Sequence, residues 1–505
     1  MKNVLVIGVG PHARRSHLPA LAVGQRDGLV GTVCGVDVLG AASVLTVFES
    51  DDGPCDLPVT PIVPFPAGEQ TLPNAVRQTL DGLVARRGID AVVVATEPAF
   101  HMPYARWALD RGLSVLLDKP LGVRANASTD PAQARAILTD VDDLLARYEL
   151  ARRHRPDVVV SVQSQRRYHP AFWRLRDLIA EVAEVTGCPV TSVQSFHSDG
   201  QWRLPDELLD LDYHGYDRGY GKCAHSGYHF FDIIPWLLAA GDASGKIADA
   251  VRVHAEVTRP VDLLAQLGVG DYERLFDGFA TRNRYTEAEL HAGLHGFGEV
   301  DASISLAFTR AGRTLTLATL NLFHNGFSQR GNLAPAAALY KGNGRVRQET
   351  HIIQQGPFQA LHLHCLQTLE GASSCADDRY ATGGDRHIEV HVFRNDRFRP
   401  GWKPYTRLGH DALTTTVDGR IAAPTQQSSR RRSVHEFLLY LNGLRDRHQM
   451  HSDLTTHRTA AALMAGTYLS MAHRWSGASP EATLSLTPPP AATPAPVRAG
   501  EVIVR

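Results

Sequence analysis

The sequence has few lysines, no long hydrophobic run and no closely spaced pair of cysteines. Of its 52 Lys and Arg residues, only six are lysine, at positions 2, 119, 222, 246, 341 and 403. No apolar run approaches the roughly 18 residues that a membrane-spanning helix needs. The six cysteines, at positions 34, 55, 188, 223, 365 and 375, show no C-x-x-C spacing. This pattern argues against a disulfide framework or a structural zinc site, and it suits a reducing cytosol.

The charge balance gives no reason to expect a polyanionic partner. A formal net charge of −1 provides no electrostatic basis for binding nucleic acid or an anionic membrane. A hydrophobic content of 43% and a charged content of 21% are typical of a soluble globular protein. The chain enters an apolar strand at once, so we expect no signal peptide and a cytoplasmic location. Its 505 residues suffice for two or more domains.

Lys119 is notable because lysine is so rare here. It lies in Asp118-Lys119-Pro120, directly after the apolar run 113–117. An ammonium is a compact donor whose pKa changes with burial, which a guanidinium does not offer. The alternative is a lysine at a strand end that reaches into solvent. The N-terminal motif favours a functional role.

A glycine-rich loop follows the first apolar run, residues 4–7. It reads Gly8-Val9-Gly10-Pro11-His12-Ala13, a G-x-G-x-x-A pattern. Such a loop places a pyrophosphate at the N-terminus of the following helix. The second apolar run ends in Asp37, where dinucleotide-binding folds place an acidic residue for the ribose hydroxyls. An Asp would repel a 2′-phosphate, so we predict NAD rather than NADP. Two alternatives remain: Asp37 as a simple turn residue, and Arg14 or Arg15 as a phosphate ligand.

The pattern of apolar runs predicts an α/β protein. Residues 1–155 are predicted to form a Rossmann domain with a doubly wound parallel sheet, and helices are predicted at 100–111 and 131–153. Residues 156–475 are predicted to form an α+β domain that starts near the strand 158–162. From about 250 to 415 this domain contains mostly strands, in one large, mostly antiparallel open sheet, and 433–474 look helical. The Pro/Ala-rich tail, 476–505, is predicted to be disordered.

Several further motifs extend this pattern. They are His17-Leu18-Pro19-Ala20-Leu21, residues 90–98 followed by His101, residues 108–115 leading into Asp118-Lys119-Pro120, and Arg166-Arg167-Tyr168-His169-Pro170-Ala171-Phe172. Together with the glycine loop they resemble the glucose–fructose oxidoreductase / inositol dehydrogenase / MocA-like (Gfo/Idh/MocA) family over most of residues 1–475. The family usually has Glu where this chain has Asp118.

The resemblance implies a Rossmann domain that binds NAD or NADP, and a second domain whose open sheet often makes the dimer contact. We therefore expect a homodimer or homotetramer through the C-terminal sheet and a small polyhydroxylated substrate. The cofactor contacts that the resemblance implies come from Gly8, Gly10, Pro11, His12, Ala13, Asp37, Thr96, His101, Asp118 and Lys119.

A second stretch resembles the family motif Asp-x-Gly-x-His-x-x-Asp. Here it reads His225-Ser226-Gly227-Tyr228-His229-Phe230-Phe231-Asp232, with His225 in place of the first Asp. We predict that His229 is the base for the substrate hydroxyl and that Lys119 stabilises the developing alkoxide. Asp232 would orient His229 or hold a substrate hydroxyl, unless it is a helix-surface residue. His225 removes a negative charge, which suits a substrate that carries a carboxylate or phosphate, or else marks an altered activity.

The remaining candidates are less specific. We expect substrate contacts from Lys119, Arg167, Trp202, His225 and His229, although ordinary packing explains Trp202 equally well. The histidine pairs 225/229, 362/364 and 387/391 have spacings at which a metal can bind. The family motif already accounts for the first pair, and positions on the surface of a sheet or in an interface explain the other two pairs better. We therefore predict no metal site.

These observations favour an NAD-dependent oxidoreductase that acts on a CH–OH group of a sugar, amino sugar, cyclitol or nucleotide-linked sugar. The preference for Arg and Ala suggests a GC-rich bacterial source and, by association, secondary metabolism. Two alternatives stay open. One is a non-catalytic, NAD-binding regulator on the same fold, and the other is a redox-assisted epimerase or glycosidase.

Overall fold

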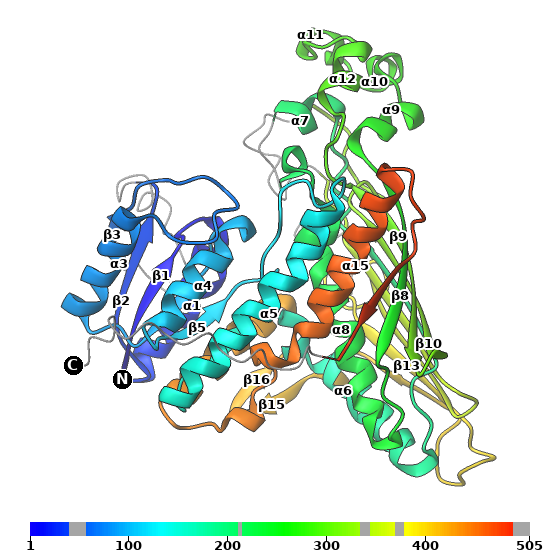
Figure 1. Cartoon of the computed structure of the whole chain (residues 1–505). Helices are drawn as coiled ribbons and strands as arrows, with labels where there is room; N and C mark the ends of the chain where they lie inside the picture. The colour runs from blue at the N-terminus through cyan, green and yellow to red at the C-terminus, as the bar shows by residue number, and fades with distance from the viewer. Residues whose placement is uncertain (40–56, 211–214, 334–343, 369–377, 488–505) are drawn as a thin grey trace.

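The computed structural model describes residues 1–39, 57–210, 215–333, 344–368 and 378–487. Figure 1 shows a smaller α/β unit beside a tall curved sheet, with long helices between them. Within the described part of the chain, no helix is long and apolar enough to cross a membrane.

The first unit is a six-stranded parallel sheet. Its strand order is β3 (Val59–Pro61), β2 (Val30–Asp37), β1 (Lys2–Ile7), β4 (Ala91–Val94), β5 (Ser114–Leu117) and β6 (Val160–Val162). The surrounding helices are α1 (Pro11–Arg26), α3 (Asn74–Arg87), α4 (His101–Asp110) and α5 (Pro131–His154). Every residue of β4 and β5 is buried, because helices cover both faces of the sheet. This confirms the predicted Rossmann architecture.

Local sequence fixes the ends of helix α5. The side chain of Asp130 accepts a hydrogen bond from the backbone N–H of Ala132 at 2.7 Å, and Pro131 occupies the first helical position. The last turn is basic, with Arg152, Arg153 and His154. Both features match the dipole of the helix, and they place the ends of α5 close to the predicted bounds of 131 and 153.

The second unit is a nine-stranded sheet. Its order is β14 (Tyr405–Leu408), β13 (Glu389–Arg394), β12 (Gln359–Leu366), β11 (Gln348–Gln355), β7 (Ser192–Ser198), β10 (Arg313–Phe323), β9 (Asp301–Arg310), β8 (Ala250–Thr258) and β17 (Ala482–Ser485). Every pair is antiparallel except β7 with β10. This confirms the predicted large, mostly antiparallel sheet.

Helices cover one face of the nine-stranded sheet. They are α6 (Pro170–Thr186), α8 (Tyr228–Leu238) and α15 (Arg458–Trp475), and they share an apolar core with alternate residues of the strands (Figure 1). On the opposite face, Leu317 is 60% exposed, and Phe393 and Tyr405 are 41% and 49% exposed. The sheet is thus open on one side.

Three expectations about the second domain need correction. The strand 158–162 does not start it, because β6 pairs in parallel with β5 and completes the first sheet. The region 250–415 also holds a group of short helices, α9 (Leu263–Gln266), α10 (Val269–Leu275), α11 (Phe279–Arg282) and α12 (Glu287–Gly293), which lie near α7 (Pro205–Asp210) at the top of Figure 1. Their cores are small, so their apolar periodicity is weak.

The third correction concerns the tail. Residues 482–485 form β17, which extends the sheet at β8, because they alternate buried and exposed side chains ahead of the proline-rich stretch. The rest of the predicted disordered segment, from 488, lies outside the described residues.

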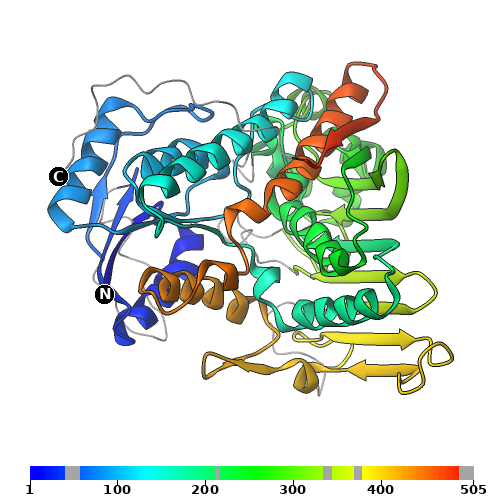
Figure 2. The same cartoon turned by 60° about the horizontal axis from the view of Figure 1, so that its bottom comes forward.

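The predicted helical region 433–474 contains two helices with different neighbours. Helix α14 (Gln426–Leu441) follows the small hairpin of β15 (Thr415–Val417) and β16 (Arg420–Ala422) and packs on the first unit. Its Val434, Phe437 and Leu438 join the core on one face of the Rossmann sheet. Helix α15 lies along α5 (Figures 1 and 2). The Rossmann unit is therefore built from both ends of the chain.

We predict that Phe437→Ala destabilises the protein by about 3–5 kcal/mol, because the ring is fully buried and its removal leaves a cavity. Denaturant unfolding followed by fluorescence measures this change. Leu444→Ala is the control, since Leu444 is 65% exposed. Equal stability of the two variants would contradict the packing described for α14.

Candidate functional site

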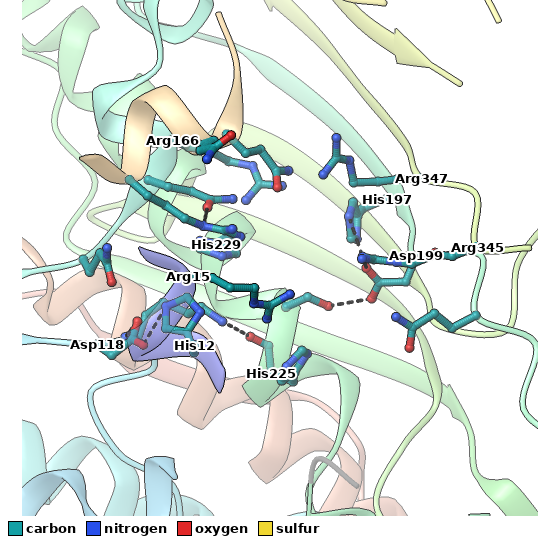
Figure 3. Close-up of a pocket in the computed structure, with 18 of the residues that line it drawn as sticks. His12, Arg15, Asp118, Arg166, His197, Asp199, His225, His229, Arg345 and Arg347 are labelled. Atoms are coloured by element: carbon teal, nitrogen blue, oxygen red, sulfur yellow. Dashed lines mark hydrogen bonds and ion pairs between the residues drawn. The ribbon is translucent and has the colours of Figure 1, made fainter. Parts of the chain in front are cut away.

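The main candidate site is a cavity of about 330 Å³ where the two units meet (Figure 3). Its walls come from the start of α1, the end of β5, the loop after β6, the end of β7, the turn before α8 and the start of α14. Lys119, His225 and His229 all line it. The structure therefore brings together the residues that carry the predicted chemistry.

The glycine loop has the geometry that a dinucleotide needs. Gly8 has a φ of +86°, and a Cβ there would lie 2.9 Å from the carbonyl oxygen of Ala95. A Cβ at Gly10 would meet nothing within 4 Å, so the space above the loop is open. Pro11 occupies the first turn of α1, where its missing N–H leaves no intrahelical bond unmade. The loop and the helix N-terminus fit a pyrophosphate group.

Asp37 lies at the end of β2, beside the glycine loop. Its Oδ2 accepts a hydrogen bond from the backbone N–H of Val9 at 2.7 Å, and its Oδ1 accepts one from Leu39 at 3.0 Å. These bonds hold the carboxylate in the crevice where an adenosine ribose would lie. The observed position fits NAD.

Lys119 connects the two units. Its Nζ donates a hydrogen bond to the backbone carbonyl of His225 at 2.8 Å. The carboxylate of Asp118 accepts a bond from the backbone N–H of Lys119 at 2.9 Å. Burial lowers the pKa of Lys119 to about 8, and Arg430 adds to this effect while Asp118 opposes it.

His229 lies in the first turn of α8, just after a π-helical turn at Cys223–Gly227. Its side chain borders the cavity, and its Nδ1 is buried with no hydrogen-bond partner among the described residues. Burial, and then the nearby charges of Lys119 and Arg166, hold the pKa of His229 well below its usual value. The ring is therefore neutral near pH 7 and able to accept a proton.

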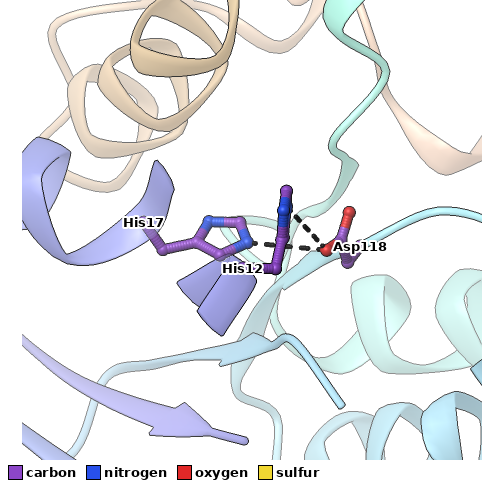
Figure 4. Close-up of side chains that lie close together, drawn as sticks. All are labelled: His12, His17 and Asp118. Atoms are coloured by element: carbon purple, nitrogen blue, oxygen red, sulfur yellow. Dashed lines mark ion pairs between the residues drawn. The ribbon is translucent and has the colours of Figure 1, made fainter. Parts of the chain in front are cut away.

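Asp118 lies beside two histidines of the α1 segment. The Nε2 atoms of His12 and His17 lie 3.0 and 3.8 Å from its Oδ2 (Figure 4). Within the described part of the chain, these three side chains are the group compact enough to share a metal ion, with ligand atoms within 4.8 Å of one another. The short His12–Asp118 contact is already a hydrogen bond, so we assign the group to fixing the end of β5.

His101 and Thr96 lie outside the cavity and fix the backbone segments that border it. The ring nitrogens of His101 lie 2.7 Å from the carbonyl oxygen of Pro120 and 3.0 Å from that of Thr96. His101 is fully buried, and burial lowers its pKa. A neutral ring has one N–H and can donate to one of these carbonyls at a time. The ring thus ties the loop after β4 to the segment that carries Lys119, and it does not line the cavity.

Of the predicted catalytic and substrate-binding residues, three lie away from the cavity, namely Asp232, Arg167 and Trp202. Asp232 is fully buried and accepts bonds from Arg167 at 2.6 Å and from Ser164, with His457 at 3.2 Å. Burial opposes the charge on Asp232, but Arg167 and His457 outweigh it and hold its pKa well below the usual range. The guanidinium of Arg167 is therefore bound in an ion pair with Asp232 and does not border the cavity. Trp202 packs against Tyr272 and Phe276 among the short helices, as the packing alternative expects.

The sequence interpretation missed most of the charge in the cavity. Besides Lys119, its walls include five arginines, at positions 15, 166, 345, 347 and 430, against the carboxylates of Asp118 and Asp199. Arg166 directly precedes the residue that we singled out. Gln163 was also missed; it is 2% exposed, and neither end of its amide has a hydrogen-bond partner among the described residues. Buried polar groups of this kind indicate a ligand site.

Asp199, directly after β7, forms another part of the cavity wall. Its carboxylate accepts hydrogen bonds from Lys222, from Ser226 at 3.1 Å and from Arg345 at 3.0 Å. Burial disfavours its charge, but Lys222, His197 and Arg345 more than compensate and hold its pKa well below the usual value. A carboxylate thus remains in the cavity although residue 225 is a histidine.

Comparison with known families agrees with this geometry. Residues 2–143 match the family model described as "Oxidoreductase family, NAD-binding Rossmann fold" (GFO_IDH_MocA). The N-terminal domain belongs to the Gfo/Idh/MocA family. This confirms the predicted family and its NAD-binding Rossmann domain. No curated protein matches the chain in sequence.

Solved structures with a similar fold match nearly the whole chain. An NAD binding oxidoreductase from Klebsiella pneumoniae has a TM-score of 0.56 at 13% identity, covering 96% of this chain and 99% of that chain. An oxidoreductase from Agrobacterium radiobacter in complex with NAD+, L-tartaric acid and magnesium has a TM-score of 0.52 at 13% identity, covering 96% and 98%. An aldose-aldose oxidoreductase from Caulobacter crescentus has the same TM-score and identity, covering 96% and 99%. At such low identity these likenesses establish the fold alone.

We predict that this protein binds NAD more tightly than NADP, by about tenfold or more, and that Asp37→Asn narrows the ratio. The substitution removes the charge that repels a 2′-phosphate and keeps an acceptor for the Val9 N–H. Titration of both nucleotides by calorimetry measures the ratio. Asp110→Asn, which removes an exposed carboxylate at the end of α4, should leave it unchanged. An unaltered ratio in the Asp37 variant would remove Asp37 from the cofactor site.

Proposed function

We propose that this protein is an NAD-dependent oxidoreductase that interconverts a secondary alcohol and a ketone on an anionic polyol. The observation that carries the proposal is the placement of Lys119 and His229 in one cavity, beside a loop that fits a dinucleotide. The cofactor, when bound, supplies the hydride acceptor in oxidation and the hydride donor in reduction.

The protein's own residues transfer the proton and stabilise the negative charge on the reacting oxygen. In oxidation, the neutral ring of His229 takes the proton of the substrate hydroxyl, and in reduction it returns a proton. Lys119 donates a hydrogen bond to the same oxygen and stabilises the negative charge that develops there. Its bond to the carbonyl of His225 orients the ammonium. Asp232 acts at a distance, by fixing the position of helix α8 against Arg167.

The charge of the cavity supports an anionic substrate. Five arginines and Lys119 line it against two carboxylates, so a negative group is favoured there. His225 fits this picture, because a third carboxylate at that position would reduce the excess of positive charge. A sugar acid, a sugar phosphate and a nucleotide-linked sugar are the classes that combine hydroxyl groups with an anion.

The remaining expectations follow as proposals. A non-catalytic, NAD-binding regulator is less consistent with the placement of both Lys119 and His229 against the cavity, and redox-assisted epimerisation or glycoside cleavage would use the same groups. We also propose a homodimer or homotetramer through the open face of the nine-stranded sheet. The apolar side chains of Leu317, Phe393 and Tyr405, exposed there, support this proposal.

We predict that wild-type protein with NAD produces NADH from an anionic polyol and that Lys119→Ala lowers kcat by about 100-fold or more. Absorbance at the NADH band measures turnover across matched neutral and anionic polyols. Lys246→Ala is the control, because Lys246 is exposed, lies outside the cavity lining and donates to the backbone of Gly187 at 2.8 Å. If neither protein produces NADH from any polyol although both bind NAD, the result would favour one of the two alternatives. These are a non-catalytic, NAD-binding regulator and an enzyme that reduces and reoxidises a cofactor it does not release.

The rate of alcohol oxidation should fall above about pH 8, because His229 is then already the neutral base, whereas Lys119 donates to the oxygen as an ammonium and burial lowers its pKa to about 8. Deprotonation above this pKa removes the charge, and kcat/KM should drop by up to about tenfold per pH unit. Arg430→Gln should shift the fall to higher pH, since the charge of Arg430 lowers the pKa of Lys119. A rate that stays flat to pH 10, or an unshifted profile in the variant, would exclude this role.

A further inference from the structure

A second cavity, of about 430 Å³, lies directly against the first. Five residues border both cavities, namely Gln165, Arg166, Arg347, Gln426 and Gln427. They come from the turn after β6, the residue before β11 and the first turn of α14. The two cavities therefore form neighbouring compartments with a shared wall, each of a size that holds one part of a small-molecule ligand.

The shared wall contains an unsatisfied donor. Arg166 is 4% exposed, and its Nε and Nη2 donate to the carboxylate of Glu349 at 2.8 and 2.6 Å. Its remaining nitrogen, Nη1, is buried with no hydrogen-bond acceptor among the described residues. A buried guanidinium with one unused edge needs a further acceptor, and beside Arg347 that acceptor is best an anion.

The second cavity contains an unsatisfied acceptor. Gln367 is 3% exposed, and its Nε2 donates to the backbone carbonyl of Asp385 at 2.9 Å. Its Oε1 is buried with no partner among the described residues. This oxygen can take an N–H from a ligand, and the side chains of Phe172, Leu363 and Ile388 supply apolar walls. A flat ring with an N–H on its edge fits these surroundings.

The group at the shared wall has to be an anion and a connection at the same time. A carboxylate ends a molecule, whereas a phosphodiester or diphosphate keeps its charge while it joins two parts. We propose that the second cavity binds the nucleoside of a nucleoside-diphosphate sugar, with the diphosphate at Arg166 and Arg347 and the sugar beside Lys119. This inference rests on the proposed function, because that function places the reacting sugar in the first cavity.

The test uses protein saturated with NAD, so that a nucleotide probe cannot occupy the cofactor site. Calorimetry with UDP, dTDP and ADP measures binding without any need for turnover. Cys365→Phe fills the second cavity from strand β12 and should weaken the best of these probes by at least 30-fold. His364→Phe places a phenyl ring at the preceding residue, whose side chain points to the opposite face of the sheet, and should change binding less than twofold.

A second variant keeps the test decisive if Cys365→Phe does not fold. Gln367→Leu removes the acceptor at similar size and should weaken the same probe by about tenfold, while NAD affinity and the thermal midpoint stay at wild-type values. The proposal is overturned if no nucleoside diphosphate binds the NAD-saturated protein, or if Cys365→Phe and Gln367→Leu bind it as the wild type does.

Turnover then separates this proposal from the proposed function. The expected result is that wild-type protein oxidises a nucleotide-linked hexose with a kcat/KM at least 30-fold above that for the corresponding hexose 1-phosphate, and that Cys365→Phe abolishes this preference. Equal use of both compounds would overturn the proposal. If UDP binds as expected and no sugar is oxidised, the nucleoside site stands and the oxidoreductase function fails.

Discussion

The hydrogen bond between the ammonium of Lys119 and the carbonyl of His225 is the contact on which the site depends. Lys119 follows a strand of the Rossmann sheet, and His225 lies in the π-helical turn before α8 of the other unit. A buried ammonium without an acceptor would be strongly destabilising. This contact gives the ammonium an acceptor and joins the two units, and Lys119 and His229 border the same cavity.

Around that contact, positive charge is concentrated beyond what folding alone would favour. Carboxylates partly balance it: Glu349 holds Arg166, and Asp199 holds Arg345. Both carboxylates line a cavity, Asp199 the first and Glu349 the second. An anion that enters the cavity thus gains interactions with cations that are already fixed in place, so little ordering of side chains opposes its binding. Preorganisation of this kind also serves a reaction in which negative charge develops.

Much of this arrangement could be predicted from the sequence, where the information is local. The glycine loop, Asp37 and the strand before Lys119 depend on a few neighbouring residues, and the structure has them as expected. The sequence could not show which of Arg166 and Arg167 lines the cavity. The answer depends on which arginine pairs with Asp232 and which with Glu349, and both carboxylates lie far away in the chain. Arg345 and Arg430 carry no local motif, and only the tertiary fold brings them to the cavity.

Helix α14 has a consequence for the order in which the molecule is made. One face of the Rossmann sheet is covered jointly by α1 near the N-terminus and by α14 near the C-terminus. During synthesis the first six strands leave the ribosome long before residues 426–441 exist. The apolar side chains on that face therefore stay partly uncovered until almost the whole chain has been translated. The nucleotide-binding unit is thus the first to be started and among the last to be completed.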